Sequence, residues 1–345
     1  MKRIVAFTVF CIATFISSYG QEYFGKILDS KSNEPLEGVS IYFDGTTIGT
    51  TTNYLGKFKI ETKQSIEASL VVSFLGYKTK VLNKVDLKQE ELIVYLEVEP
   101  MTLAEVVIEE DNWSREKKWK YFKQEFLGKT LASNQCKFLN SKDIRLVYSK
   151  SENKLFASSK NPIQIINKSL GYRIDYNLVD FEIVFIGNKN FIRVERVYYS
   201  GTSQFREINE KKIKKKYVKA RENVYNGSFL HFMRCIANES LAENKFQLYI
   251  KPEPRSKQFV GISPTAVFKT KKLKTKETEV IINRRGKITI MYKGFSQSGI
   301  TLEDEETTFK IDGYGNYYPI YKLLVSGEFG KNRISSMLPS NYGID

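Results

Sequence analysis

The chain of 345 residues contains one histidine, His231, and this limits the hydrolytic chemistry open to it. A Ser-His-Asp triad or a Cys-His pair would have to use this residue as its base. A zinc site of the His-x-x-Glu type needs a second histidine as well, and Arg234 stands where its glutamate would be. The sequence predicts a helix that begins after Ser228, with His231 roughly opposite its apolar positions. We therefore favour a structural or surface role for His231 over catalysis or ligand contact.

The cysteines offer a second candidate chemistry. Cys11 lies in an apolar N-terminal stretch, which leaves Cys136 and Cys235 in the rest of the chain. In an oxidising compartment these two could form a disulfide, and two free buried thiols fit the sequence equally well. We expect neither thiol to act as a nucleophile with His231 as its base.

The acidic run and the glycine-rich segments give weaker signals. Adjacent acids such as those of Glu303–Glu306 are typical of a solvated turn, whereas a glycosidase needs two carboxylates on opposite sides of a cleft. The Gly49–Lys57 segment lacks the spacing of a phosphate loop, and Gly313 and Gly315 are not followed by the third glycine of a dinucleotide motif. We predict no catalytic, cofactor-binding or metal-binding residue, and no cofactor.

The N-terminus has the pattern of a signal peptide. A positively charged start, an apolar stretch over Ile4–Ile16 and small residues at Ser18 and Gly20 predict cleavage after residue 20. The stretch is too short to span a bilayer, and no other segment is long and apolar enough. We expect an exported protein of the periplasm, outer membrane or cell surface, with no transmembrane segment in the mature chain.

Net charge divides the mature chain in two. Residues 21–112 hold nine lysines and no arginine against sixteen acidic residues, a net charge of −7, whereas residues 113–345 carry +20. This change predicts a domain boundary near residue 110.

The first part, residues 22–109, has the pattern of a β-sandwich. Short apolar runs alternate with turn signals and show no helical period, which predicts a seven-stranded Greek-key β-sandwich. The strands are expected at Tyr23–Leu28, Val39–Phe43, Lys57–Ile60, Leu70–Phe74, Leu92–Val98 and Val106–Ile108. Positive φ angles are expected at four turn glycines, namely Gly45, Gly49, Gly56 and Gly76.

This part resembles the carboxypeptidase-regulatory-like domain, a prealbumin-like (transthyretin-like) sandwich that is common in envelope proteins of Gram-negative bacteria. The similarity rests on GKILDSKSNEPLEGVSIYFDGTTIGTTTNYLGKFKI at 25–60, LVVSFLGYKTK at 70–80 and LAEVVI at 103–108. Asn53 replaces the usual Asp and preserves the turn chemistry. In TonB-dependent receptors a similar domain precedes a plug and a large barrel, for which the residues after 109 are too few.

The resemblance does not bring peptidase activity with it. A zinc carboxypeptidase holds its metal with two histidines and a glutamate, and this sequence supplies only His231. We therefore expect no enzyme activity of that kind.

The second part, residues 113–345, is expected to be a β-rich α+β domain with two main helices. One helix should begin after Ser114 and end at Gly128, and the other should begin after Ser228. Strands are expected at Ile144–Tyr148, Phe181–Ile186, Phe191–Tyr199 and Lys245–Ile250, with a hairpin over Val280–Met291 that turns at Asn283–Gly286. FLGKT at 126–130, KNPIQIINKSLGYRIDYNLVDFE at 160–182 and YNGSFLHFMR at 225–234 resemble the companion region of exported proteins with such a sandwich, a region of unknown function.

The run Lys211–Lys219 is the strongest charge feature of the second part. It is interpreted either as a solvated segment before the helix at Ser228 or as a contact with anionic envelope material. No nucleic acid is expected as a partner, because an exported protein rarely meets one and aromatic residues do not interleave the lysines.

Together these observations predict a non-catalytic, exported cell-envelope protein. It would act as a binding or scaffold module, or as an accessory of a surface assembly, with an envelope protein or anionic envelope polymer as its partner. The alternative is an uncharacterised carboxylate-based hydrolase, such as a glycosidase, of the periplasm or cell surface. A cleft lined by two acids with raised pKa values would favour that alternative.

Overall fold

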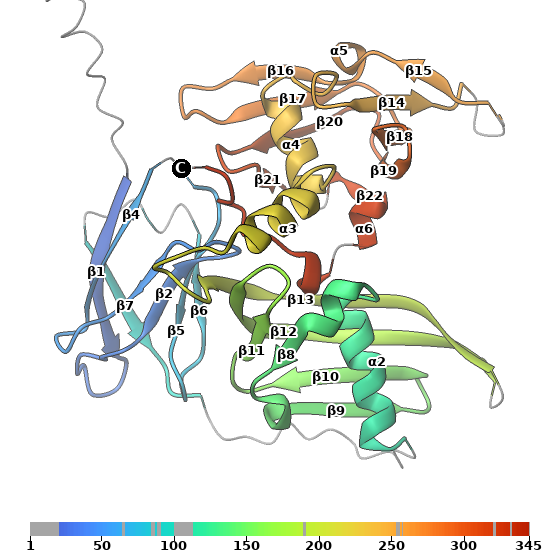
Figure 1. The fold of residues 1–345 in the computed structure, drawn as a ribbon. Coiled ribbons are helices and arrows are strands. Elements are labelled where there is room, and N and C mark those ends of the chain that lie inside the picture. Colours follow the sequence, from blue (N-terminus) through green and yellow to red (C-terminus); the bar gives the residue numbers. More distant parts are fainter. Residues whose placement is uncertain are drawn as a thin grey trace, which may run out of the picture.

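The computed structural model describes most of the chain from residue 21 onwards. The predicted signal peptide over residues 1–20 and the predicted strand Val106–Ile108 lie outside the described residues. These are 21–63, 66–83, 87, 91–99, 113–188, 191–252, 256, 258–319, 322–331 and 333–344. The protein is mainly β, and Figure 1 shows a blue sandwich beside a green sheet and an orange-to-red pair of sheets.

The N-terminal sandwich consists of two sheets with the strand orders β4-β1-β7 and β3-β2-β5-β6. Alternate residues of β4 face inwards, and Phe58 and Ile60 pack there against Ile27 and Phe43. The sandwich is confirmed, and β3 and β6 are short strands that the apolar runs did not reveal. The strands are β1 (Gln21–Asp29), β2 (Ser40–Phe43), β3 (Gly49–Thr51), β4 (Lys57–Thr62), β5 (Leu70–Ser73), β6 (Lys80–Leu82) and β7 (Leu92–Leu96).

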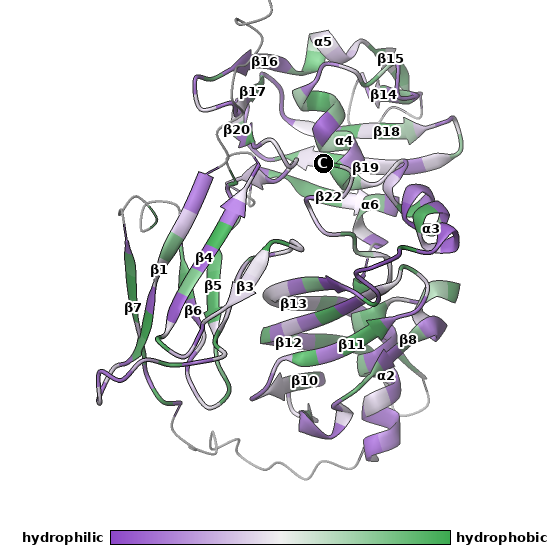
Figure 2. Ribbon diagram, turned by 60° about the vertical axis from the view of Figure 1, so that its left-hand side comes forward, coloured by the Kyte–Doolittle hydropathy of each residue, from purple (hydrophilic) through white to green (hydrophobic). Residues whose placement is uncertain are grey.

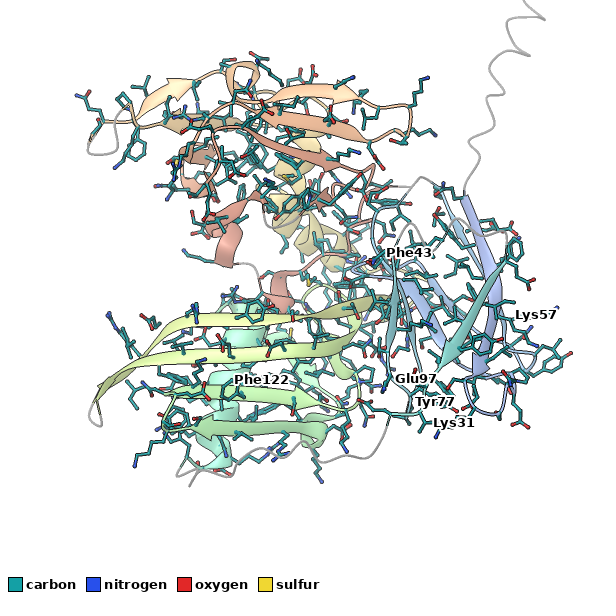
Figure 3. The ribbon with its side chains drawn as sticks, turned by 180° about the vertical axis from the view of Figure 1, so that it is seen from behind. Lys31, Phe43, Lys57, Tyr77, Glu97 and Phe122 are labelled. Carbon is teal, nitrogen blue, oxygen red and sulfur yellow. The ribbon has the colours of Figure 1, made fainter. Side chains whose placement is uncertain are left out.

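Hydrogen bonds to Asp29 fix one end of the sandwich, where Figure 3 labels Lys31 and Tyr77. The Tyr77 hydroxyl and the Lys31 N–H each donate to the carboxylate at 2.8 Å. Together with the N–H of Ser32, which has the largest effect, they lower the pKa of Asp29 to about 2. The Gly-Tyr pair of the family motif thus joins the β5–β6 loop to the end of β1.

One of the four predicted turn glycines was assigned wrongly. Gly45, Gly56 and Gly76 have φ angles of 70°, 71° and 83°. Gly49 instead lies in β3, where a Cβ atom would come within 2.8 Å of the Gln204 side chain. Because Gly49 has no side chain, Gln204 of the central part of the chain can pack against it.

A six-stranded sheet with one helix follows the sandwich. The strands β11 and β10 pair with successive parts of one edge of β12, and β13 pairs with the other edge. β8 continues the sheet beyond β11, and β9 continues it beyond β10. We call this the central sheet; its strands are β8 (Cys136–Phe138), β9 (Ile144–Ser149), β10 (Lys154–Ser159), β11 (Ile163–Asn167), β12 (Tyr172–Asn188) and β13 (Phe191–Glu207).

Helix α2 (Arg115–Leu127) covers one face of the central sheet. It has the predicted caps, because the Ser114 side chain accepts a hydrogen bond from Lys117 N and Gly128 ends the helix. Phe122, labelled in Figure 3, and Phe126 pack against Phe181. Short 3-10 helices over Leu131–Gln135, Ser141–Asp143 and Ile334–Ser336 complete this region.

Two further sheets form the third group, with the orders β15-β14-β18-β19-β22 and β16-β17-β20-β21. Helix α4 (Phe229–Ala237) contributes Phe232, Met233 and Ile236 to the core that these sheets share. The sheets contain β14 (Phe246–Ile250), β15 (Val260–Ile262), β16 (Lys269–Lys272), β17 (Thr278–Ile282), β18 (Gly286–Tyr292), β19 (Ser296–Leu302), β20 (Thr307–Ile311), β21 (Tyr317–Tyr318) and β22 (Leu324–Gly327). The other α-helices of the described residues are α3 (Lys215–Tyr225), α5 (Pro264–Val267) and α6 (Glu328–Lys331).

The predicted hairpin over Val280–Met291 is wrong. Its two strands exist as β17 and β18, but β17 pairs with β16 and β20, whereas β18 pairs with β14 and β19. The segment Asn283–Arg285 therefore passes from one sheet to the other. A short connection between two apolar runs is compatible with both arrangements, so local sequence could not separate them.

Each of the three groups has its own hydrophobic cluster. The second part of the chain contains two of them, one under α2 and one around α4. The predicted boundary near residue 110 falls between the described residues 99 and 113. The division into domains over residues 22–109 and 113–345 stays a prediction.

Candidate functional site

The turn after β2 joins the sandwich to the central sheet through backbone hydrogen bonds. Gly45 N donates to Ser203 O at 2.7 Å, and Phe205 N donates to Thr46 O at 2.9 Å. Thr46 thereby forms a parallel bridge with Gln204 of β13. Figure 2 shows the sandwich edge beside β12 and β13. The sandwich therefore extends the hydrogen-bonding pattern of the central sheet.

The side chain of Asp44 closes the same junction. Its carboxylate accepts a hydrogen bond from Ser203 N at 2.7 Å. Burial raises the pKa of Asp44 to about 6, although hydrogen bonds from Ser203 N and Gly45 N favour the charged form. The loss of water around the carboxylate therefore raises its pKa by more than the two hydrogen bonds lower it.

A turn from the third group supplies a second contact. Asp312 accepts hydrogen bonds from Tyr314 N at 2.9 Å and from Glu67 N of the sandwich at 3.0 Å. The turn places the Tyr314 side chain, 2% exposed, in the hydrophobic cluster of the sandwich. The Gly313–Gly315 segment, which does not match a nucleotide motif, thus completes a core.

The C-terminal segment is held against both parts by Arg234 of α4. Its guanidinium donates to the carbonyl oxygens of Tyr314 at 3.0 Å, Ser340 at 2.7 Å and Tyr342 at 2.7 Å. Ser340 N donates in turn to Gly45 O at 2.8 Å. The sandwich, the third group and the C-terminal segment therefore meet at one place.

A cleft of about 470 Å³ opens between the sandwich and the central sheet, and we call it the junction cleft. Its floor arises from strand alternation. In β12, Tyr172, Ile174 and Tyr176 point into the core, so the residues between them face the sandwich. The cleft is lined by Gly38, Ser40, Tyr42, Ser73, Phe74 and Leu75 of the sandwich, and by Asn140, Asp143, Asn161, Pro162, Gln164, Arg173, Asp175, Asn177, Gln204 and Arg206 of the central sheet and its loops.

Two arginines and one aspartate form the centre of the floor. Arg206 Nη2 lies 3.0 Å from Asp175 Oδ2 and donates to Gln204 Oε1 at 2.7 Å. Arg173 Nε lies 3.6 Å from Asp175 Oδ1, which is too far for a hydrogen bond. Arg173 Nε and Asp175 Oδ1 are both buried without a hydrogen-bond partner. The floor therefore contains an ion pair whose two nearest atoms make no hydrogen bond.

A second cluster fixes the loops at the rim. The Asp143 carboxylate accepts hydrogen bonds from the amides of Asn140 at 3.1 Å and Asn161 at 3.0 Å. Asn140 also donates to Pro162 O at 2.9 Å and accepts from Gln164 N at 2.9 Å. These bonds hold two loops of the central sheet in one orientation.

The sandwich wall is partly apolar. Tyr42 accepts a hydrogen bond from the Asn177 amide at 2.6 Å, which ties this wall to the floor. Burial raises the pKa of Tyr42 to about 12. Phe74 is partly buried, whereas Leu75 is 71% exposed. One side of the cleft is thus polar and the other has an apolar rim.

The structure places His231 in a buried site in the third group, away from the residues that line the junction cleft. Gly227 N donates to its Nδ1 at 3.1 Å, so Nε2 carries the proton and faces Asn244 Oδ1 at 3.2 Å. Burial, together with nearby Arg234, lowers the pKa of His231. The ring is neutral and its two nitrogens are hydrogen-bonded, which is a structural arrangement.

Cys136 and Cys235 are both free and buried, and they belong to different hydrophobic clusters. Burial raises the pKa of Cys136 to about 12 and that of Cys235 to about 11. Neither thiol is therefore ionised at neutral pH, as a nucleophile would have to be.

The remaining candidates lie on the surface. Glu303–Glu306 are exposed between β19 and β20, and Asp304 pairs with Lys322 at 2.8 Å. In the basic run, residues 211–216 are exposed, and α3 begins at Lys215. Among the described residues no group of three or more His, Cys, Asp or Glu side chains could hold a metal ion. In the same part of the chain, no helix is long and apolar enough to cross a membrane.

None of the residues of the junction cleft was predicted from the sequence. The one usable signal was the alternation of Tyr172, Ile174 and Tyr176 with Arg173 and Asp175. This pattern predicts a strand with one polar face, but not what that face opposes. The opposing wall lies in a distant part of the chain.

The comparisons define the class of the N-terminal part. Residues 23–108 match the family model of the CarboxypepD_reg-like domain, as their β-sandwich and sequence motifs led us to expect. The TonB-dependent receptor P3 of Formosa agariphila is 29% identical over 108 residues, which are 31% of this chain and 10% of the receptor. The chain thus spans about a tenth of the length of that relative.

Among solved structures, a 9R-lipoxygenase from Cyanothece PCC8801 overlaps with 65% of this chain and 46% of its own. The identity is 11% and the TM-score is 0.19, so this overlap carries no argument about fold or function.

Proposed function

We propose that this protein is a non-catalytic component of the bacterial cell envelope that binds a ligand in the junction cleft. The observation that carries the proposal is the cleft itself, which has unpaired polar atoms on its floor and fixed walls. The CarboxypepD_reg-like domain and the similarity to a TonB-dependent receptor support an envelope location.

The carboxylate-based hydrolase has one observation in its favour, because Asp143 and Asp175 both line the junction cleft. Their surroundings favour binding instead. Asp175 lies between Arg173 and Arg206, and Asp143 accepts two amide hydrogen bonds. These contacts hold both carboxylates as fixed parts of the cleft lining.

Cell fractionation of the full chain tests the location, and a reducing-end assay tests the absence of hydrolysis. We expect the protein in the envelope fraction, with a mature N-terminus close to Gln21, and no new reducing ends from envelope polysaccharides. Recovery from the cytoplasm with Met1 retained would contradict the proposed location. Reducing ends that disappear in Asp175→Asn would favour the hydrolase.

A contact with an anionic envelope polymer is proposed for the exposed lysines before and within the first turn of α3. Lys214 N-caps this helix without a side-chain hydrogen bond, and the first turn contains no acidic residue. Excess positive charge at a helix N-terminus is unfavourable unless an anion offsets it.

A further inference from the structure

The floor of the junction cleft has hydrogen-bonding capacity that the described residues leave unused. The Gln164 side-chain amide has no hydrogen-bond partner among them, and neither does Asn161 Oδ1. The Arg173 guanidinium has only its 3.6 Å contact with Asp175. Donors and acceptors are therefore mixed along one wall.

The hydrogen-bonding groups along this wall indicate what kind of ligand fits there. Most buried polar atoms in folded proteins have a partner, so Asp175 Oδ1 and Arg173 Nε form an incomplete network. A hydroxyl group donates one hydrogen bond and accepts others, so it can complement the Gln164 amide, which has both a donor and an acceptor, and the exposed part of the Arg173 side chain. A carboxylate or phosphate only accepts, and it would leave the amide oxygens of Gln164 and Asn161 without a donor.

The formal charge of the cleft argues for an uncharged ligand. Two arginines, Arg173 and Arg206, are balanced by two aspartates, Asp143 and Asp175. An anion bound to Arg173 would approach Asp175, whose Oδ1 lies 3.6 Å from Arg173 Nε. This repulsion favours a neutral molecule.

The opposite wall is partly apolar, with Phe74 and Leu75 beside the polar Ser40, Tyr42 and Ser73. Phe74 and Leu75 stand on the sandwich side of the cleft, across from the polar floor. A sugar ring has an apolar face of C–H groups and a rim of hydroxyls, so it complements both walls at once. A cleft of about 470 Å³ lies in the size range of small-molecule sites, about 300–1,000 Å³.

A peptide is a less suitable occupant. Extended peptides commonly bind by pairing with the free edge of a sheet. In the floor, β12 pairs with β11 along one edge and with β13 along the other, so it offers no free edge inside the cleft.

We infer that the junction cleft binds a short, uncharged oligosaccharide, with Gln164 and Arg173 as its hydroxyl-binding residues and Phe74 and Leu75 against its apolar face. The inference rests on the proposed function, because it names the ligand class of the same cleft. The walls are already joined by the Tyr42–Asn177 bond, so the cleft is formed before the ligand arrives.

Calorimetric titration of the mature chain tests the inference. The neutral probes are maltotriose, cellotriose, laminaritriose, mannotriose and chitotriose, and the comparison probes are trigalacturonate, inorganic phosphate and trialanine. We expect binding of at least one neutral trisaccharide. Gln164→Leu and Arg173→Met should each weaken it tenfold or more, because each removes hydrogen-bonding groups and keeps much of the side-chain volume.

Arg145→Met is the matched control, since Arg145 is exposed on β9 of the same sheet and does not line the cleft. Its affinity should equal that of the unchanged protein. The inference is overturned if no neutral probe binds, if only a comparison probe binds, or if Gln164→Leu and Arg173→Met bind as tightly as Arg145→Met. Those results would leave the envelope location standing, because fractionation tests the location separately.

Discussion

Two side chains, Tyr314 and Asp44, show how closely the sandwich depends on the rest of the chain. Tyr314 belongs to the turn between β20 and β21, yet it lies in the sandwich core. Asp44 belongs to the sandwich, yet it accepts a hydrogen bond from β13. Each is buried by residues far from it in sequence, so each affects stability through the junction.

Replacing Tyr314 by Ala should destabilise the protein by about 3–5 kcal/mol, the usual loss for a buried aromatic side chain. The substitution removes a ring from a closed core and leaves a cavity that the sandwich cannot easily fill. Urea unfolding of Tyr314→Ala and Tyr314→Phe measures the effect. The Phe variant keeps the ring and should lose much less, and equal losses in both would contradict a packing role.

Asp44 should make stability fall as pH rises from about 4 to about 6. Its pKa is raised from 3.8 to about 6 in the folded protein, so in this interval the folded state holds a proton that the unfolded state has released. The loss of folding free energy should not exceed about 3 kcal/mol, because a tenfold change in proton affinity corresponds to about 1.4 kcal/mol.

Asp44→Asn isolates this contribution, because an amide oxygen still accepts from Ser203 N and carries no charge. Thermal melts at pH 4 and pH 7 should show the variant gaining stability relative to the unchanged protein at the higher pH. A difference that is the same at both pH values would show that Asp44 does not titrate in this way.

At the scale of elements, the basic run and α3 make one prediction. Replacing Lys214, Lys215 and Lys216 by Gln removes positive charge from the N-terminus of a helix, where it opposes the helix dipole. The melting temperature should stay equal or rise slightly, while retention on immobilised dextran sulfate at low salt should decrease. Lys271, Lys272 and Lys274 are exposed around β16, and their replacement by Gln is the control. Equal retention of the two triple variants would assign the run to an ordinary solvated surface.

Local sequence predicted the elements whose signals are local. The caps Ser114 and Gly128 predicted α2, and the cap Ser228 together with the apolar spacing of the residues after it predicted α4. Helix α3 was not predicted because its lysines are typical of a solvated segment. Its buried side consists of Tyr217 and Arg221. The partners of β17 and β18, and the whole junction cleft, depend on contacts between distant residues, which no local pattern encodes.

At the scale of the whole molecule, the junction predicts that the sandwich is less stable alone. A fragment of residues 21–99 lacks Tyr314 and Ile344, which pack against its core, and it exposes the turn at Asp44. We expect β-type circular dichroism with a lower melting temperature than the full chain. A fragment that melts at the temperature of the full chain would show that the sandwich is independent of the junction.

The hydrogen bond between Glu67 and Asp312 joins residues that are 245 positions apart. This separation matters for the order in which the parts of the chain are synthesised and fold. A ribosome makes the chain from its N-terminus, so the sandwich strands emerge long before the turn that completes their core. Until Tyr314 is synthesised, part of the apolar surface of the sandwich is not covered. Such exposed apolar surface binds chaperones and promotes aggregation. If the protein is exported as proposed, we expect the incomplete core to keep the early chain loosely folded, in the state in which it can still be threaded through a secretion channel.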